Sequence, residues 1–167
     1  MIIWFTGQPN SGKTTLALEL VHRLHEIRKD VTATIIDGDS LRTITKNVDY
    51  SKDGRRKNIQ SAINLATNSD ASNDYTVVAL VSPFRDLRES LKNNKKHSVK
   101  EVYLHSSRLR EGKMVDYYEP PLTNYLDIDT DKHTMEDVSF CHLVKEQGIN
   151  VWVHPEVIVK HEKKVLL

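Results

Sequence analysis

The eight residues Gly-Gln-Pro-Asn-Ser-Gly-Lys-Thr at positions 7–14 constrain the fold of this chain more than any other stretch. They are preceded by the apolar run Met-Ile-Ile-Trp-Phe-Thr and followed by residues 12–29, whose leucines recur near helical spacing. An apolar run that ends in glycine predicts a buried strand, and the leucine stripe predicts a helix with one face on a core. The sequence therefore predicts a strand, a glycine-bounded loop and a helix in direct succession.

This arrangement is the one that binds the phosphates of a nucleotide. The loop directs several backbone N–H groups inward at a helix N-terminus, which forms a concave site for anions. Gly12 allows close backbone approach, Lys13 can reach the outer phosphates, and the Thr14 hydroxyl can bind Mg²⁺. The sequence thus predicts that ATP and Mg²⁺ are the cofactors. The predicted ATP site comprises Gly7, Gln8, Pro9, Asn10, Ser11, Gly12, Lys13, Thr14 and Thr15.

Length and charge exclude several other classes of protein. The 167 residues suit one compact domain, and the formal net charge of +1 favours neither a nucleic acid nor a membrane as partner. The single cysteine, Cys141, cannot form an intrachain disulfide and reads as a small core residue. The apolar run at positions 1–6 is too short for a signal or transmembrane segment. We therefore expect a cytoplasmic protein.

The remainder of the chain alternates between strand and helix patterns, which predicts a parallel sheet covered by helices on both faces. We expect an α/β, three-layer fold, with residues 1–150 as one domain and residues 151–167 as its C-terminal extension. Proline 83 is expected in the first turn of its helix. The expected strands are residues 31–37, 75–82, 99–105 and 124–130, and the expected helices are residues 51–70, 83–93 and 134–148.

Two carboxylates follow the second expected strand. Asp37 and Asp39 emerge at the strand's carboxyl end, where doubly wound folds place their ligands. One can accept the proton of a hydroxyl that receives phosphate, and the other can hold a metal-bound water. The expected metal ligands are Thr14 and Asp37. The pattern does not decide which aspartate is the base. The alternative is a turn in which Asp39 only caps a helix.

Four segments together resemble the adenylylsulfate kinase family. They are GQPNSGKTTLA, DGDSLR, YSKDGRRKNI and VSPFRDLR, in that order, and the resemblance extends over roughly residues 1–148. It implies a P-loop kinase fold with a mostly parallel sheet. It also implies transfer of the ATP γ-phosphate to the 3′-hydroxyl of adenylylsulfate, with Mg²⁺.

The resemblance assigns further residues to the site. Ser82 matches a serine regarded as a possible transient phosphate carrier, so Lys13, Asp37, Asp39 and Ser82 are the catalytic candidates. Thr130 and Arg108 are implied on the ATP side. The residues implied to bind the phosphate acceptor are Asp39, Arg42, Tyr50, Arg55, Asn58, Val81, Ser82, Pro83 and Arg85.

The chain also departs from the family pattern. Ser40 stands where the family has asparagine, and the long lid after the fourth strand is reduced to SSRLREGKMVDYYEPP, without its Phe-Thr-Gly-Ile element. Arg108, Arg110 and Lys113 could neutralise transferred charge or simply be solvated. Two alternatives therefore stay open. One is a kinase for a nucleoside, nucleic-acid end, sugar or small alcohol, and the other is a nucleotide-binding protein without kinase activity. A homodimer is also compatible with the resemblance.

Overall fold

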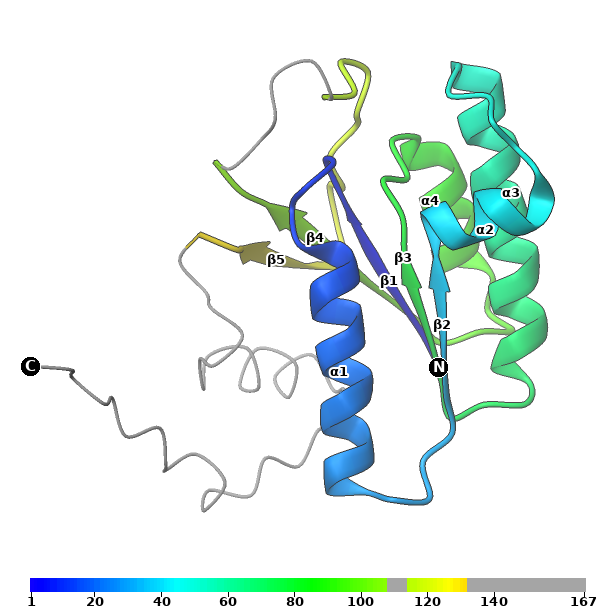
Figure 1. The fold of residues 1–167 in the computed structure, drawn as a ribbon, viewed down its shortest axis with the longest axis vertical. Coiled ribbons are helices and arrows are strands. Elements are labelled where there is room, and N and C mark those ends of the chain that lie inside the picture. The colour runs from blue at the N-terminus through cyan, green and yellow to red at the C-terminus, as the bar shows by residue number, and fades with distance from the viewer. Residues whose placement is uncertain (108–113, 132–167) are drawn as a thin grey trace, which may run out of the picture.

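The computed structural model describes residues 1–107 and 114–131 and contains one five-stranded parallel sheet in the order β2-β3-β1-β4-β5 (Figure 1). The strands are β1 (Ile2–Gly7), β2 (Ala33–Asp37), β3 (Tyr75–Ala79), β4 (Val99–His105) and β5 (Tyr125–Asp129). Every neighbouring pair of these strands is parallel. The α/β class and the three-layer arrangement are confirmed.

Helices cover the two faces of the sheet. Helix α1 (Lys13–Ile27) packs on one face through Leu16, Leu20 and Leu24, against Phe5 and Leu104 of the sheet. Helices α2 (Gly38–Thr45), α3 (Lys52–Asp70) and α4 (Arg85–Asn93) lie on the opposite face (Figure 1), where a second apolar cluster forms around Trp4 and Val78. The sequence forms this core because the central strands are apolar on both sides, as a sheet between two helix layers requires.

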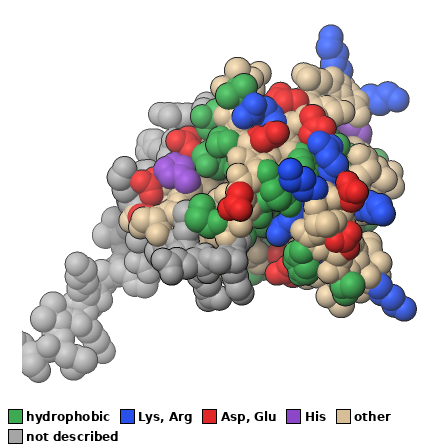
Figure 2. Space-filling view, turned by 90° about the horizontal axis from the view of Figure 1, so that it is seen from above, with side chains coloured by type: hydrophobic (Ala, Val, Ile, Leu, Met, Phe, Trp, Pro, Cys, Tyr) green, Lys and Arg blue, Asp and Glu red, His purple; other side chains and the backbone are tan. Residues whose placement is uncertain are grey.

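The register of the strands brings their carboxyl ends to one edge. Gly7 is paired with Leu104, and Asp37 is paired with Ala79. The loops that follow β1, β2 and β3 therefore emerge together at this edge. Figure 2, a view from above, shows lysine and arginine side chains mixed with aspartate and glutamate on this side of the molecule.

One local expectation is wrong. Pro83 does not lie in the first turn of α4, because the helix begins at Arg85 with Phe84 as its N-cap. Ser82 has a φ of 30°, and the Pro83 carbonyl accepts a hydrogen bond from the Glu119 N–H. Residues 82 and 83 therefore lie outside the helix. The alternative in which Asp39 caps a helix is also excluded, because the N-cap of α2 is Asp37.

Some expectations lie outside the described residues, namely the helix at 134–148, the place of Cys141 and the extension at 151–167. Within residues 1–107 and 114–131, no helix is both long and apolar enough to cross a membrane.

Candidate active site

The phosphate loop, residues 7–14, has the shape that the sequence predicts. Gly7 has a φ of 148°, and a Cβ placed there would lie 2.1 Å from the carbonyl oxygen of Leu104, so no other residue fits without movement. Gly12 has a φ of 87° and caps α1. The Lys13 ammonium folds back over the loop and donates to the Gln8 carbonyl at 2.6 Å and to Ser11 Oγ at 3.2 Å. The loop therefore presents a cation and backbone donors at the start of a helix.

The Lys13 ammonium is mostly buried, and burial lowers its pKa to about 8, although Asp39 and Asp37 oppose the shift. ATP phosphates favour the charged ammonium, so they raise this pKa on binding. ATP affinity should then fall as the pH rises above about 8, by up to about tenfold per pH unit. Calorimetry in two buffers of different ionisation enthalpy should find proton uptake on ATP binding at about pH 9 and far less at about pH 7. Equal proton uptake at both pH values would contradict this assignment.

The two aspartates that follow β2 have different environments. The Asp37 carboxylate accepts from the backbone N–H groups of Asp39 and Ser40, each at 3.1 Å, and from Thr14 Oγ1 at 2.9 Å. The Asp39 side chain is exposed in the cavity, and the described part of the chain gives its carboxylate no hydrogen-bond donor. Asp37 is therefore oriented by its surroundings, whereas Asp39 is available to a bound molecule.

Thr14 and Asp37 fit a magnesium site. Mg²⁺ prefers oxygen ligands and is usually bound through one or two protein groups beside substrate phosphates, with waters completing its shell. The hydroxyl of Thr14 and the carboxylate of Asp37 lie at hydrogen-bond distance from each other, next to the phosphate loop. Two oxygen donors of the required type thus meet where the phosphates of ATP are expected.

One cavity of about 970 Å³ joins the phosphate loop to the loops after β2 and β3. It brings together predicted residues from four separate stretches of sequence. The predicted site residues that line it are Pro9, Asn10, Gly12, Lys13, Thr14, Thr15, Asp37, Asp39, Arg42, Tyr50, Arg55, Asn58, Val81, Ser82 and Pro83. It is also lined by residues that the sequence analysis did not select: Gly38, Ile59, Ala79, Leu80 and Met114.

Two arginine side chains lie near the Tyr50 ring in this cavity. The Arg42 guanidinium carbon lies 4.2 Å from the centre of the Tyr50 ring, and that of Arg55 lies 5.5 Å from it. Arg42 Nη1 also donates to the carbonyls of Asn47 and Asp49, at 3.0 and 2.8 Å. Burial lowers the pKa of the Arg42 guanidinium. Arg42 therefore holds the loop that carries Tyr50, a role that the sequence analysis did not give it.

Asn58 contributes a buried polar group to the cavity. Its side chain lies on α3, is only 5% exposed and lines the cavity. Within residues 1–107 and 114–131, no hydrogen-bond donor reaches its Oδ1 atom. A buried amide oxygen costs free energy when it lacks a donor, so this atom is suited to accept from a bound molecule.

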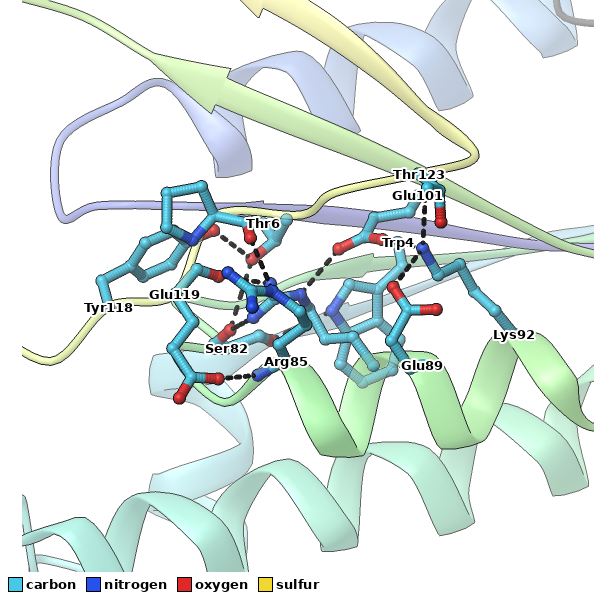
Figure 3. A network of polar contacts seen from close by, with 12 residues as sticks. Trp4, Thr6, Ser82, Arg85, Glu89, Lys92, Glu101, Tyr118, Glu119 and Thr123 are labelled. Carbon is cyan, nitrogen blue, oxygen red and sulfur yellow. Dashed lines mark hydrogen bonds and ion pairs between the residues drawn. The ribbon is translucent and has the colours of Figure 1, made fainter.

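Ser82 belongs to a buried polar network (Figure 3). Its hydroxyl accepts from Trp4 Nε1 at 3.0 Å, and the side chain is only 1% exposed. Its carbonyl accepts from Arg88, whose guanidinium also donates to Glu101 Oε1 at 2.6 Å and to the Glu119 carbonyl. Glu101 forms a second ion pair with Lys92, at 2.6 Å. The network holds the loop of residues 81–85 through these buried hydrogen bonds, and Ser82 serves in it as a hydrogen-bond acceptor.

Replacing Ser82 by alanine should therefore affect stability more than chemistry. The buried Trp4 N–H would lose its acceptor, which costs about 1–3 kcal/mol of unfolding free energy. We expect kcat to fall by less than about tenfold, because in-line phosphoryl transfer needs no covalent intermediate. Urea unfolding and steady-state kinetics measure the two effects. A folded Ser82→Ala protein without phosphotransfer would instead give Ser82 a chemical role.

Among the described residues, five predicted ones do not line the cavity. Gly7, Gln8 and Ser11 shape the loop from behind. Thr130 Oγ1 donates to the Ser11 carbonyl at 3.3 Å and so braces the loop. Arg85 contacts residues 119 and 120, since its backbone N–H donates to Glu119 Oε2 at 2.7 Å and its Nε donates to the Pro120 carbonyl at 2.9 Å. Arg108, Arg110 and Lys113 lie outside the described residues.

Arg88 and Met114 were missed by the sequence analysis. Arg88 was overlooked because charged residues are usually exposed, yet its spacing of three from Leu91 places both on the buried side of α4. Met114 had no motif to mark it.

Comparison with known proteins agrees with this geometry. A curated adenylyl-sulfate kinase from Bacteroides thetaiotaomicron is 28% identical over 162 residues, covering 82% of this chain and 78% of its own. A probable adenylyl-sulfate kinase from Pyrococcus abyssi is 36% identical over 88 residues, covering 52% and 49%. The APS kinase of Mycobacterium tuberculosis, solved in complex with AMPPNP and APS, superposes with a TM-score of 0.70 at 21% identity, covering 86% and 96%. The family model described as adenylylsulphate kinase matches residues 1–116, and the chain belongs to this family.

Proposed function

We propose that this protein transfers the γ-phosphate of ATP to the 3′-hydroxyl of adenylylsulfate. The observation that carries the proposal is that a single cavity joins the phosphate loop to Tyr50, Arg55 and Asn58. The first part suits a nucleotide triphosphate, and the second suits another nucleotide, with an aromatic ring, a cation and a buried amide oxygen. Membership of the adenylylsulphate kinase family supports the same reaction.

On the donor side, the backbone N–H groups of residues 7–14 and the Lys13 ammonium bind the ATP phosphates. The Gln8 carbonyl and Ser11 Oγ hold that ammonium over the loop, and phosphate oxygens of ATP take their place. Thr14 and Asp37 would hold Mg²⁺, which offsets the charge of the outer phosphates when it is bound. The protein's part is mostly to position and to stabilise negative charge.

On the acceptor side, the Asp39 carboxylate accepts the proton of the attacking hydroxyl. It is the aspartate whose carboxylate no hydrogen-bond donor of residues 1–107 or 114–131 holds, whereas Asp37 is oriented by three donors. Arg55 supplies positive charge for the phosphosulfate, and Asn58 Oδ1 accepts from the nucleoside part. Tyr50 stacks on the adenine ring, with Arg42 fixing its loop.

The proposal is tested by the release of ADP from Mg·ATP with a panel of phosphate acceptors. The panel contains adenylylsulfate, adenosine, a 5′-hydroxyl oligonucleotide, gluconate and a buffer blank. We expect stimulation by adenylylsulfate alone. Stimulation by another member, with none by adenylylsulfate, would show that the cavity serves a different acceptor. ATP binding without ADP release across the panel would favour a protein without kinase activity.

A further inference from the structure

The side chain of Gln8 lies in the phosphate loop but makes its contacts outside it. Its Nε2 donates to the Val115 carbonyl at 3.0 Å, and the Val115 backbone N–H donates to its Oε1 at 3.0 Å. One carboxamide thus satisfies both backbone polar groups of a residue that is 107 positions away in the sequence. Two bonds between the same partners fix orientation as well as distance.

Met114, the residue before Val115, faces the cavity of the candidate active site. Met114 lines the cavity and is 47% exposed, whereas Val115 is only 4% exposed. The backbone is held at Val115, directly after Met114, so the Gln8–Val115 pair restricts where Met114 can lie. A methionine thioether adapts well to flat and irregular apolar surfaces, including aromatic rings.

The 114–120 segment is held independently at its other end. Tyr118 shares a hydrogen bond of 2.7 Å with Thr6 (Figure 3). The Glu119 N–H donates to the Pro83 carbonyl at 3.0 Å. Arg85 and Arg88 also bind Glu119. The Val115 carbonyl also accepts from the Tyr118 N–H at 3.0 Å. Loss of the Gln8–Val115 pair would therefore loosen the backbone at Met114, while the end near Glu119 stays attached to the loop of residues 81–85.

We propose that Gln8 is a positioning residue for the phosphate acceptor, which acts by holding Met114 in the cavity wall against the bound acceptor nucleotide. This inference rests on the proposed function for the identity of that nucleotide. It separates two roles within Gln8. The backbone carbonyl belongs to the Lys13 site, whereas the carboxamide serves the acceptor side.

The first test compares Gln8→Met with the matched variant Gln60→Met. Methionine keeps the length of glutamine and removes both hydrogen bonds, and Gln60 lies exposed on α3, bonded only to Asn64 among the described residues. We expect Gln8→Met to raise KM for adenylylsulfate about tenfold, since two net hydrogen bonds are lost, with little change in ATP affinity. Gln60→Met should leave both unchanged. An equal loss of ATP affinity in Gln8→Met would mean that Gln8 only stabilises the phosphate loop, and the proposal would fail.

A double-mutant cycle tests whether Gln8 acts through Met114. If it does, Gln8→Met should add little to the KM for adenylylsulfate once Met114→Ala is present, because the side chain that it positions is already absent. Additive effects of the two changes would overturn this part of the proposal.

A third measurement does not depend on adenylylsulfate. Hydrogen exchange of the Val115 amide should accelerate in Gln8→Met and stay unchanged in Gln60→Met. Unchanged exchange in Gln8→Met would refute the pairing whatever the phosphate acceptor is. An absence of adenylylsulfate turnover in the unsubstituted protein, with accelerated exchange in Gln8→Met, would refute the proposed function instead.

Discussion

Replacing Asp39 by asparagine is expected to lower kcat by about 10²–10⁴-fold, the usual contribution of a positioned general base. Asparagine keeps the size of the side chain but cannot accept the proton of the attacking hydroxyl. ATP binding should survive, because the phosphate loop and Lys13 are untouched. Single-turnover kinetics with labelled ATP, together with calorimetric ATP binding, measure both quantities.

Asp37→Asn is the matched control for this result. Asp37 is expected to act through Mg²⁺ and through the N-cap of α2, where its carboxylate accepts from the backbone of Asp39 and Ser40. Its replacement should raise the Mg²⁺ concentration needed for half-maximal rate, an effect that Asp39→Asn should not share. Asp39→Asn with an unchanged kcat would remove Asp39 from the reaction.

Replacing Arg88 by methionine is expected to destabilise the protein by about 3–5 kcal/mol, as is typical when one partner of a buried ion pair is removed. The Arg88 and Glu101 side chains are each 1% exposed, so the loss is not repaired by solvent. The carbonyls of Ser82 and Glu119 would also lose a donor. Urea unfolding measures the effect through the midpoint and its slope.

Two further variants bound this prediction. Arg56 pairs with Asp86 at 2.8 Å on the surface, so Arg56→Met should cost less than about 1 kcal/mol. Combining Arg88→Met with Glu101→Gln should recover part of the loss, since the buried carboxylate is then neutral. An Arg88→Met protein as stable as Arg56→Met would show that the network does not hold this part of the fold.

The elements of the fold could be predicted from sequence where a single local pattern dominates. The strand at residues 99–105 is predicted to the residue, because its valines, tyrosine and leucine stand between two polar stretches. The start of α4 could not be predicted from a local pattern. It depends on tertiary contacts, in which the Ser82 carbonyl accepts from Arg88 and the Pro83 carbonyl accepts from Glu119. The phosphate loop was predictable because its shape is set by its own glycines.

The candidate site shows the same division. Lys13, Asp37 and Tyr50 lie in short motifs, and the structure brings them to one cavity as expected. The roles of Arg42 and Gln8 side chains were not visible in the sequence, because each bonds to the backbone of another residue. Every residue type has a backbone N–H or carbonyl group, so a sequence pattern cannot show which residue is the partner. Thus the sequence predicted which residues meet but not how they hold one another.

The most direct test of the central claim is the identity of the phosphorylated product. The purified protein is incubated with Mg·ATP and adenylylsulfate. The nucleotides are then separated and identified by their masses in mass spectrometry, and Lys13→Ala is the control. The account predicts equal amounts of ADP and of adenylylsulfate that carries one additional phosphoryl group, neither of which Lys13→Ala produces. Adenylylsulfate that remains unmodified while the protein still binds ATP would contradict the account.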